Sequence, residues 1–505
     1  MSRHSSPVEV ELKLLVPCNS VARLLRHPAL AKGGRAVCSR LHSIYYDTPA
    51  LDLQRHGQTL RVRREGRRWV QTIKDEGEVR GGLHRRAELE MAIDGPAPRF
   101  AEPSGLSGVL ASPRVRAQLR PLFTTDFQRT RRLLQPQPGV RIEASVDRGF
   151  IRSGARRAEV SELELELKAG APHHLYDLAV RVAEAVPLAI SDRSKAERGY
   201  ALALGTTDSP ARASAAALGQ TMSVHDAFRA VLWRGLSHLQ GNETGMAESR
   251  DIEYLHQMRV AVRRLRSAIG IFRPLFPDEA LSAARHDLKW LASELGPARD
   301  WDVFATETLP AIAGKSGAGH GRDGLQSQCE RLRRAAHRRA RGALRSDRYR
   351  RFTLALAAWL SQEDWRRGLD ERAMTALDAP VPDYAHRVLR KRYKRARKKG
   401  RGLERLSARE LHRLRIAIKK LRYAADFFSG LYEASAVRAM SKRLSRLQDI
   451  LGAINDAAMA TRLAEQAGGV DARRLVLRWR RDRVATLLRD LKRAWREFRA
   501  TRKFW

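Results

Sequence analysis

The sequence predicts an α+β protein in which an antiparallel β-barrel is followed by an all-α domain built from a duplicated helical bundle. Residues 8–204 contain short segments in which polar and apolar residues alternate, the period of a half-buried strand. From about residue 224 the period becomes that of a helix. Residues 205–223 are rich in Ala, Ser, Thr and Gly, which is typical of a linker. We therefore predict a domain over residues 7–204, the linker 205–223 and a second domain over residues 224–499.

The first domain contains six segments with a clear strand pattern, and helical stretches lie around residues 20–27, 113–120 and 173–186. The strand segments are VEVELKLL (8–15), TLRVRRE (59–65), WVQTIKD (69–75), RRAELEMAI (85–93), VRIEASVD (140–147) and VSELELELK (160–168). Successive side chains of a strand point to opposite faces, so each strand has a charged face and an apolar face. Helices covering the apolar faces would leave the charged faces inside a closed barrel. A half-exposed sheet with solvated charged faces is the alternative.

The charged faces combine carboxylates with basic side chains. Glu9, Glu11 and Lys13 form one row on the first strand, and a row of three glutamates precedes Lys168 on the last. Clustered carboxylates are hard oxygen donors for Mg²⁺ or Mn²⁺, whereas converging Arg and Lys side chains bind phosphate oxygens. Neither set could be buried alone without a large desolvation cost. Together they indicate a metal-bound polyphosphate as the ligand.

The second domain repeats itself. LHQMRVAVRRLRSAIGIF (255–272) aligns with LHRLRIAIKKLRYAADFF (411–428), and LASELGPARDWDV (291–303) aligns with LQDILGAINDAAM (447–459) at the same offset. Two segments in one register indicate a duplicated helical unit. In each copy a His and three basic residues form one stripe, and apolar residues form another. The basic stripes are His256, Arg259, Arg263 and Arg266 in the first copy, and His412, Arg415, Lys419 and Arg422 in the second.

The charge balance restricts the partners. The chain has 96 Lys and Arg against 56 Asp and Glu, a net charge of +40, which predicts a polyanion such as nucleic acid, an anionic membrane or polyphosphate. Three distant cysteines, Cys18, Cys38 and Cys329, suggest neither a disulfide framework nor a cysteine metal site. No apolar run approaches the length of a membrane span, and the longest, FTLALAAWL, covers only residues 352–360. We expect a soluble cytoplasmic protein without a membrane span.

A series of motifs in the first domain resembles the CYTH family, the triphosphate tunnel metalloenzymes. The motifs are VEVELK, IYYDTP, LRVRR, TIKDEG, GGLHRRAELE, LFTTDFQRTR, IEASVDRG, ELELELK and SDRSKAERGY. The opening E-x-E-x-K is the signature of that family, and GGLH and LFTTDF are most similar to bacterial inorganic triphosphatases. The resemblance implies an eight-stranded antiparallel tunnel that binds a triphosphate with a divalent metal, Mg²⁺ or Mn²⁺.

The resemblance also implies roles for individual residues. Glu9, Glu11, Glu164 and Glu166 would bind the metal, with Glu162 and Glu143 as further candidates. The triphosphate would be bound by Arg61, Arg63, Lys74, Arg86, Arg129, Lys195 and Arg198. Lys13 would contact a phosphate or assist proton transfer, which makes Lys13, Glu9 and Glu11 the candidate catalytic residues. In FQRTRR, either Arg129 or Arg131 could enter the lumen.

The helical part, over about residues 224–499, resembles the CHAD domain. This implies two helical bundles that flank a basic cavity and bind inorganic polyphosphate, whereas a solvated surface is the alternative for a basic stripe alone. The basic runs at 331–345 and 389–401 fit a polyanion surface, and could equally serve nucleic acid. If the two histidines gain charge, polyphosphate should bind more tightly below about pH 6.5.

The resulting functional prediction is metal-dependent hydrolysis of inorganic triphosphate, with a C-terminal domain that binds polyphosphate. Alternatives are an adaptor that binds polyphosphate or nucleic acid without turnover, and an enzyme acting on an organic triphosphate, either an adenylate cyclase or a thiamine triphosphatase. Because every proposed catalytic group precedes Gly205, the first domain is expected to work alone. We expect the protein in the cytoplasm, in association with polyphosphate granules.

Overall fold

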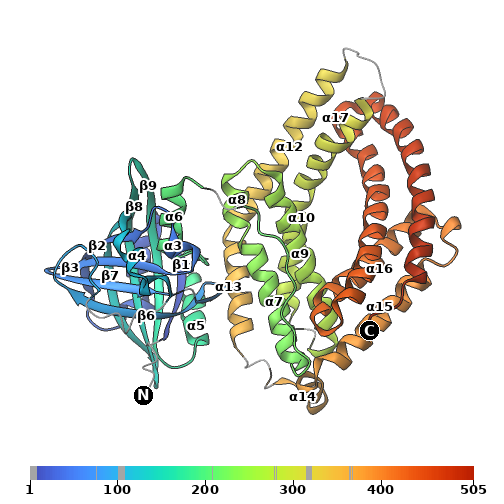
Figure 1. The fold of residues 1–505 in the computed structure, drawn as a ribbon. Helices are drawn as coiled ribbons and strands as arrows, with labels where there is room; N and C mark the ends of the chain where they lie inside the picture. Colours follow the sequence, from blue (N-terminus) through green and yellow to red (C-terminus); the bar gives the residue numbers. More distant parts are fainter. Residues whose placement is uncertain are drawn as a thin grey trace. The chain divides into compact units, whose positions relative to one another are not determined.

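The computed structural model describes residues 8–75, 77–100, 108–206, 209–277, 279, 281–313, 321–362, 366 and 368–505. These residues form two compact units, Met1–Ser209 with Asp347–Gln362, and Pro210–Ser346 with Glu363–Trp505 (Figure 1). The sequence-based boundaries stay a prediction, because residue 7 and linker residues 207–208 lie outside the described residues.

The first unit is built on a closed antiparallel barrel. Around the ring, eight strands follow in the order β1 (Val8–Leu15), β9 (Arg156–Ala169), β8 (Val140–Ser153), β7 (Arg120–Gln137), β2 (Val37–Asp47), β3 (Thr59–Glu65), β4 (Arg68–Lys74) and β6 (Leu83–Ile93). The ring closes because β6 pairs back onto β1. The short strands β5 (Glu78–Arg80) and β10 (Ala189–Ile190) add to it at β6 and β1. The prediction of an antiparallel barrel is therefore confirmed.

Strands β2 and β7 were not among the six strand segments that the alternation pattern predicted. Each contributes buried apolar or aromatic residues, such as Leu41 and Tyr45 on β2 and Phe123 and Phe127 on β7. The two strands pair along nearly the full length of β2, with a register shift between Tyr45 and Tyr46. They complete the ring between β8 and β3.

Short helices surround the strands of the first unit. They are α1 (Val21–Leu25), α2 (Pro28–Ala31), α3 (Asp52–Arg55), α4 (Pro113–Ala117), α5 (His173–Ala183) and α6 (Lys195–Leu204). Helix α6 begins with a capping box formed by Ser194 and Glu197. It lies against β7 and β8, where the ring of Phe123 occupies the space that a side chain at Gly199 would need. This packing fixes the start of α6 beside the strands.

One helix of the first unit comes from far along the chain. Helix α13 (Asp347–Ser361) packs against α5 and β10, and it contains the apolar run that the sequence showed at 352–360. Both helices bury apolar residues, such as Tyr176 and Val182 on α5 and Phe352 and Leu356 on α13. The two-part composition of this unit was not foreseen from the sequence.

The second unit is almost entirely helical in its described residues. Its helices are α7 (Val224–Gln240), α8 (Glu243–Glu248), α9 (Ile252–Phe272), α10 (Ser282–Val303), α11 (Leu309–Ala313), α12 (Gly321–Arg345), α14 (Glu371–Asp378), α15 (Val381–Lys399), α16 (Ala408–Phe427) and α17 (Ala434–Ala500). The backbone of α17 is not helical at Gly468 and Gly469, so two helices meet there at a kink. The prediction of a helical second domain is confirmed at this level.

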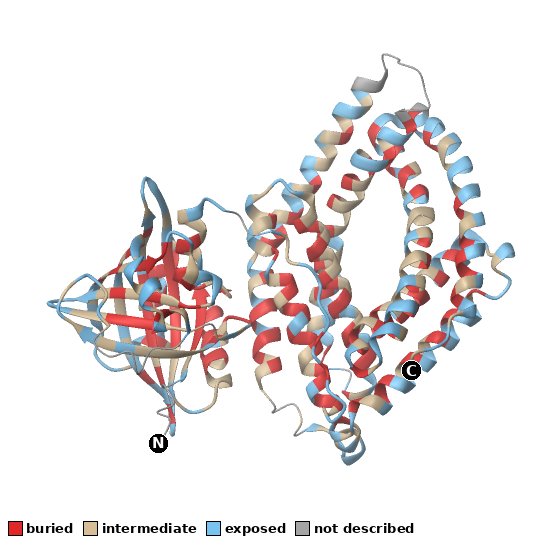
Figure 2. Cartoon of the chain, viewed as in Figure 1, coloured by how far each residue is buried: buried red, intermediate tan, exposed pale blue. Residues whose placement is uncertain are grey.

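The predicted apolar stripes form the core of the second unit. Met258, Val262, Leu265 and Ile269 on α9 are all buried, as is the matching set on α16, Leu414, Ile418, Leu421 and Ala425. Buried and exposed residues accordingly alternate along these helices with a helical period (Figure 2). None of the helices that the structure describes is long and apolar enough to cross a membrane.

Candidate active site

The barrel encloses a polar cavity of about 290 Å³. It is lined by most residues of the predicted site: Glu9, Glu11, Lys13, Arg61, Arg63, Lys74, Arg86, Arg129, Glu164, Glu166 and Lys195. Two predicted residues, Glu162 and Arg198, are not part of the lining, although they pair with each other at 3.0 Å. The charged face of the first strand therefore points into the lumen and not to bulk water.

The register of the strands explains how these side chains meet. On β1, Glu11 lies opposite Glu166 of β9 and His84 of β6, and Lys13 lies opposite Glu164. Residues directly opposite each other in an antiparallel pair share one face of the sheet. Because β1 alternates strictly, all three of its charged residues share the inner face.

A network of buried ion pairs surrounds Glu164. Its carboxylate lies 2.5 Å from Lys13 Nζ, 3.0 Å from Lys195 Nζ and 2.5 Å from Arg129 Nη2. Burial alone would raise the pKa of Glu164, but these three cations hold that pKa well below its ordinary value. Conversely, burial would lower the pKa of Lys13, yet Glu11 and Glu164 raise it above its ordinary value. Both groups are therefore charged in the network.

Lys195 reaches this network from the first turn of α6. Its ammonium lies 2.6 Å from Asp147 and also pairs with Glu162. Oxygens of Asp147, Glu162 and Glu164 lie within 4.8 Å of one another, close enough to share a metal ion. The Lys195 ammonium contacts all three carboxylates, and Lys13, Arg129 and Arg198 also pair with members of the cluster, so the protein itself neutralises it.

Asp147 is a site residue to which the sequence analysis assigned no role. It is fully buried and accepts two hydrogen bonds of 2.7 Å from the guanidinium of Arg129. Burial opposes ionisation, but Lys195 and Arg129 lower the pKa of Asp147. The signal was present in the alternation of β8, which also places Glu143 on the same face.

The sequence left open whether Arg129 or Arg131 enters the lumen, and the structure places both in the cavity lining. Each lines the cavity, but the Arg129 side chain is 15% exposed and bonded to Asp147, whereas Arg131 is 51% exposed and lies 4.0 Å from Glu143. Arg129 therefore belongs to the buried network and Arg131 to the rim.

A second group of ion pairs joins β1, β3, β4 and β6. Lys74 Nζ lies 2.6 Å from Glu9 and 3.1 Å from Glu88, and Arg61 lies 3.8 Å from Glu88 and 3.6 Å from Glu90. Glu88 and Glu90 also line the cavity and had no predicted role. Their positions follow from the pairing of β6 with β4, in which Lys74 lies opposite Glu88.

In one part of the lumen several carboxylates lie close enough to repel one another. Burial, together with the nearby carboxylates of Glu9 and Glu143, raises the pKa of Glu166, and Lys168 offsets this only in part. Mutually repelling carboxylates that face a cavity provide hard oxygen ligands for a divalent cation. The donor set of Glu9, Glu143 and Glu166, with Glu11 beside them, therefore fits Mg²⁺ or Mn²⁺.

Another part holds guanidinium groups with unused donors. The Nε–H groups of Arg61, Arg63 and Arg86 are buried, and none of them has a hydrogen-bond partner among the described residues. Burial and the charges of Arg61 and Arg129 lower the pKa of Arg63 to about 10. Buried donors and crowded positive charges are both stabilised by an anion with several acceptor oxygens.

The basic stripes of the second unit partly converge. Burial and the charges of Arg415, Arg263 and Arg259 lower the pKa of Lys419 to about 7. These cations come from both stripes, because α9 carries Arg259 and Arg263 and α16 carries Arg415 and Lys419. The structure therefore brings the middle of the two stripes together.

The ends of the stripes behave differently. His256 is partly buried, and burial with the charge of Arg299 lowers its pKa. His412 is exposed and bonds Asn455, and Arg266 is also exposed. Arg422 lies beside Asp426, whose pKa is raised by burial in spite of Arg264 and Arg422. Only part of the predicted set therefore shares one location.

An antiparallel barrel with a lumen charged in both signs, followed by a helical domain with convergent basic stripes, defines the class of the protein. Residues 8–200 match the family model of the CYTH domain, and residues 230–465 match that of the CHAD domain. The chain therefore carries a CYTH domain followed by a CHAD domain.

Individual relatives cover different parts of the chain. An inorganic triphosphatase of Haemophilus influenzae is 36% identical over 163 residues, which are 32% of this chain and 46% of that relative, so the match spans about half of the relative's length. An uncharacterized Mycobacterium tuberculosis protein is 26% identical over 456 residues, 86% of this chain and 83% of the relative. The crystal structure of the CHAD domain from Ricinus communis is 33% identical with a TM-score of 0.48, and the match covers 59% of this chain and 98% of that one.

Proposed function

We propose that the barrel hydrolyses a triphosphate, specifically inorganic triphosphate, with Mg²⁺ or Mn²⁺. The observation that carries this proposal is the presence in one cavity of three buried guanidinium groups with unused donors and a group of mutually repelling carboxylates. A metal-bound phosphate chain complements both. The similarity to the Haemophilus inorganic triphosphatase supports the same conclusion.

The basic residues of the cavity would bind and orient the phosphate chain. Arg61, Arg63 and Arg86 would donate their free Nε–H groups to phosphate oxygens, and Lys74 and Arg129 border the same space. Lys195 and Arg198 also belong to the predicted phosphate-binding set. In the structure they pair with Glu162, so we propose that they act mainly by positioning that carboxylate.

The carboxylates divide into two groups with different proposed roles. Glu9, Glu11, Glu143 and Glu166 would hold the divalent cation, which when bound neutralises phosphate charge and helps activate a water. Glu164 is contacted by Lys13 and Arg129, and Glu162 by Lys195 and Arg198. These two carboxylates would bind the cation only if their partners moved. Lys13 remains a candidate for contact with a phosphate or for proton transfer.

Turnover measurements on several substrates test this proposal. The full chain would be assayed for phosphate release from tripolyphosphate, ATP and thiamine triphosphate, with Mg²⁺, with Mn²⁺ and with EDTA. We expect metal-dependent turnover that is fastest on tripolyphosphate. The proposed roles of the lumen residues are to bind phosphate oxygens or the cation, and none of them is proposed to bind a base or an organic group. Faster turnover of an organic triphosphate would identify a different substrate, and binding without turnover would favour the adaptor.

We further propose that the helical domain is a duplicated bundle that binds inorganic polyphosphate between its two copies. The observation favouring this is that Arg259 and Arg263 of α9 lie near Arg415 and Lys419 of the contacting helix α16, where their charges lower the pKa of Lys419. A long anion would relieve that repulsion. The cytoplasmic location and the association with polyphosphate granules remain predictions.

A double variant tests the polyphosphate site. Arg263→Gln with Lys419→Gln should weaken binding of long-chain polyphosphate, and the loss should be largest at low salt. Arg409→Gln with Arg413→Gln is the matched control, because it removes two exposed charges from α16 outside the stripe. Equal losses in both double variants would contradict a defined site.

A further inference from the structure

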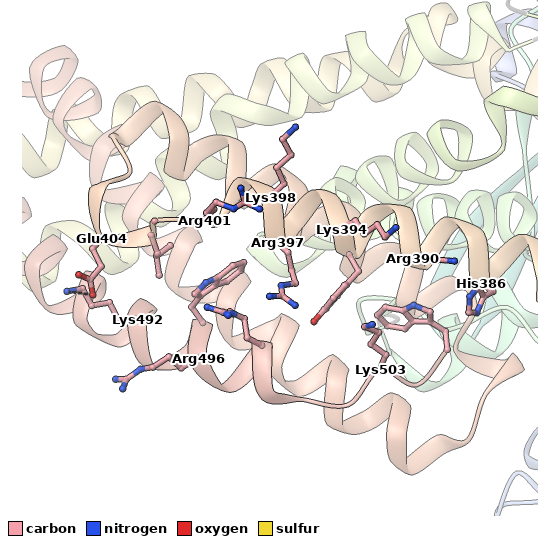
Figure 3. A pocket seen from close by; sticks show the side chains of 17 residues that line it. His386, Arg390, Lys394, Arg397, Lys398, Arg401, Glu404, Lys492, Arg496 and Lys503 are labelled. Atoms are coloured by element: carbon pink, nitrogen blue, oxygen red, sulfur yellow. Dashed lines mark ion pairs between the residues drawn. The ribbon is translucent and has the colours of Figure 1, made fainter.

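The second unit contains another, larger cavity, of about 1010 Å³ (Figure 3). One wall is formed by α15 and the turn that follows it, and the other by the last turns of α17 with the segment up to residue 505. Figure 3 shows Lys394 and Arg397 along the first wall, and Arg496 and Lys503 on the second. The basic run at 389–401 therefore forms part of a defined groove.

The groove carries a large uncompensated positive charge. Nine Lys and Arg residues line it, together with His386, against one acidic residue, Glu404, which pairs with Lys492 at 3.0 Å. Within the described chain, none of the other eight cations forms an ion pair or a hydrogen bond with a carboxylate. These eight are Arg390, Lys394, Arg397, Lys398, Arg401, Arg496, Arg499 and Lys503. Unpaired like charges around one hollow indicate an anionic ligand.

Three aromatic side chains also line the groove, namely Tyr393, Trp495 and Trp505. The ring centroids of Tyr393 and Trp505 are 5.6 Å apart in an edge-on arrangement, and Lys503 Nζ lies 5.3 Å from the Tyr393 ring. Close packing holds Trp495 in place, because a Cβ atom at Gly400 would lie 2.3 Å from its ring. Tyr393 and Trp495 are largely buried, whereas Trp505 is half-buried and offers the more accessible ring.

The groove is separate from the polyphosphate site proposed above. None of the eight residues of the two basic stripes lines it. One of its walls, from Lys492 to Trp505, also lies beyond residues 230–465, the part that matches the CHAD family model. A function of this groove is therefore not implied by the CHAD match.

We propose that the groove binds single-stranded nucleic acid. Sites for single strands combine a positively charged groove along the backbone with aromatic side chains that contact bases. The cations would contact phosphates, and Trp505 would contact a base. Inorganic polyphosphate would use the charges but leave the accessible ring of Trp505 without a role, so we favour the ligand that uses both. This inference is independent of the proposed tunnel activity.

The test uses the full chain and a fluorescein-labelled twelve-residue oligouridylate, measured by anisotropy over a range of salt concentrations. Arg397→Gln with Arg496→Gln removes one charge from each wall. We expect binding to weaken at least about tenfold, and the slope of log K against log salt to become shallower by about 1.4, since each single-strand phosphate contact contributes about 0.7.

The matched control is Arg395→Gln with Arg489→Gln. Both residues are exposed arginines on the same two helices, and neither lines the groove. We expect this control to bind the oligonucleotide within about twofold of the unchanged chain. Equal weakening in both double variants, or no binding by the unchanged chain, would overturn the proposal.

Tryptophan fluorescence separates the two kinds of anion. The oligonucleotide should quench the protein's emission, and Trp505→Leu should reduce that quenching while circular dichroism stays unchanged. Arg397→Gln with Arg496→Gln could instead lose affinity for polyphosphate of matched charge and keep its affinity for the oligonucleotide. The ligand would then be an inorganic chain, and the nucleic-acid proposal fails.

Discussion

The affinity of the helical domain for polyphosphate should depend on pH through Lys419. This ammonium lies among like charges, with Arg415 on its own helix and Arg259 and Arg263 on α9, while Asp456 on α17 acts in the opposite direction. A bound polyanion would stabilise the protonated form and raise its pKa again. Because binding then takes up a proton, affinity should rise as pH falls.

The magnitude follows from the depressed pKa. In the free protein the pKa of Lys419 is about 7, so the group is about half protonated at pH 7. If the complex restores at least the ordinary value, affinity should fall about fifteenfold between pH 7 and pH 8.5, and change only about twofold between pH 6 and pH 7. The sequence predicted a rise in polyphosphate affinity below about pH 6.5 through protonation of the two histidines. This is less favoured, because burial and the charge of Arg299 lower the pKa of His256.

Isothermal titration of long-chain polyphosphate at constant ionic strength, from pH 6 to pH 8.5, measures this dependence. Lys419→Arg keeps a charge over the whole range, so its affinity should be nearly constant above pH 7. Lys419→Met should also remove the dependence, at a lower affinity. An unchanged pH profile in Lys419→Arg, or a constant affinity of the original chain above pH 7, would refute the role of Lys419.

Four further predictions concern the first unit. Glu11→Gln should abolish metal-dependent phosphate release from tripolyphosphate with no change in circular dichroism, and turnover at the original rate would contradict the ligand assignment. Because Phe352 of α13 is buried, Phe352→Ala should lower the free energy of unfolding by about 3–5 kcal/mol in urea titrations. A chain ending at residue 206 should be destabilised in the same way, and full thermal stability of that chain would show that α13 is dispensable. Lys195→Met leaves the buried carboxylates around it without their common cation, so it should destabilise the unliganded fold by about 3–5 kcal/mol, whereas a loss of activity alone would contradict this structural role.

The inward direction of the charged faces could be predicted because alternation fixes which residues share a face. Glu9, Glu11 and Lys13 lie on the charged face of β1. Because the ring of strands closes, the charged faces of its strands point into one lumen. Alternation does not determine which strand lies beside which. The contact of Glu164 with Arg129 depends on β8 lying between β9 and β7, and its contact with Lys195 depends on the position of α6. Local pattern specifies neither.

The placement of α13 shows a different limit. Its apolar run reads as a helix or a short buried segment, and the surrounding sequence is helical, so a pattern analysis assigns it to the second domain. The sequence of an amphipathic helix shows that one face is apolar, but not which surface that face packs against. Here it covers α5, where the amide of Gln362, just past the end of α13, also donates to Asp177.

The distribution of charge within the lumen explains how a barrel can bury so many carboxylates. A buried carboxylate without a partner destabilises the fold, so Asp147 and Glu164 need the ammonium of Lys195 before any ligand binds. Glu166 pairs with the half-exposed Lys168, and the nearby charges of Glu9 and Glu143 raise its pKa. The first group therefore stabilises the protein, whereas the second keeps a mutual repulsion that a bound cation would relieve. Since these roles depend on neighbours and not on residue type, a row of alternating glutamates shows where the site lies but not which members bind the metal.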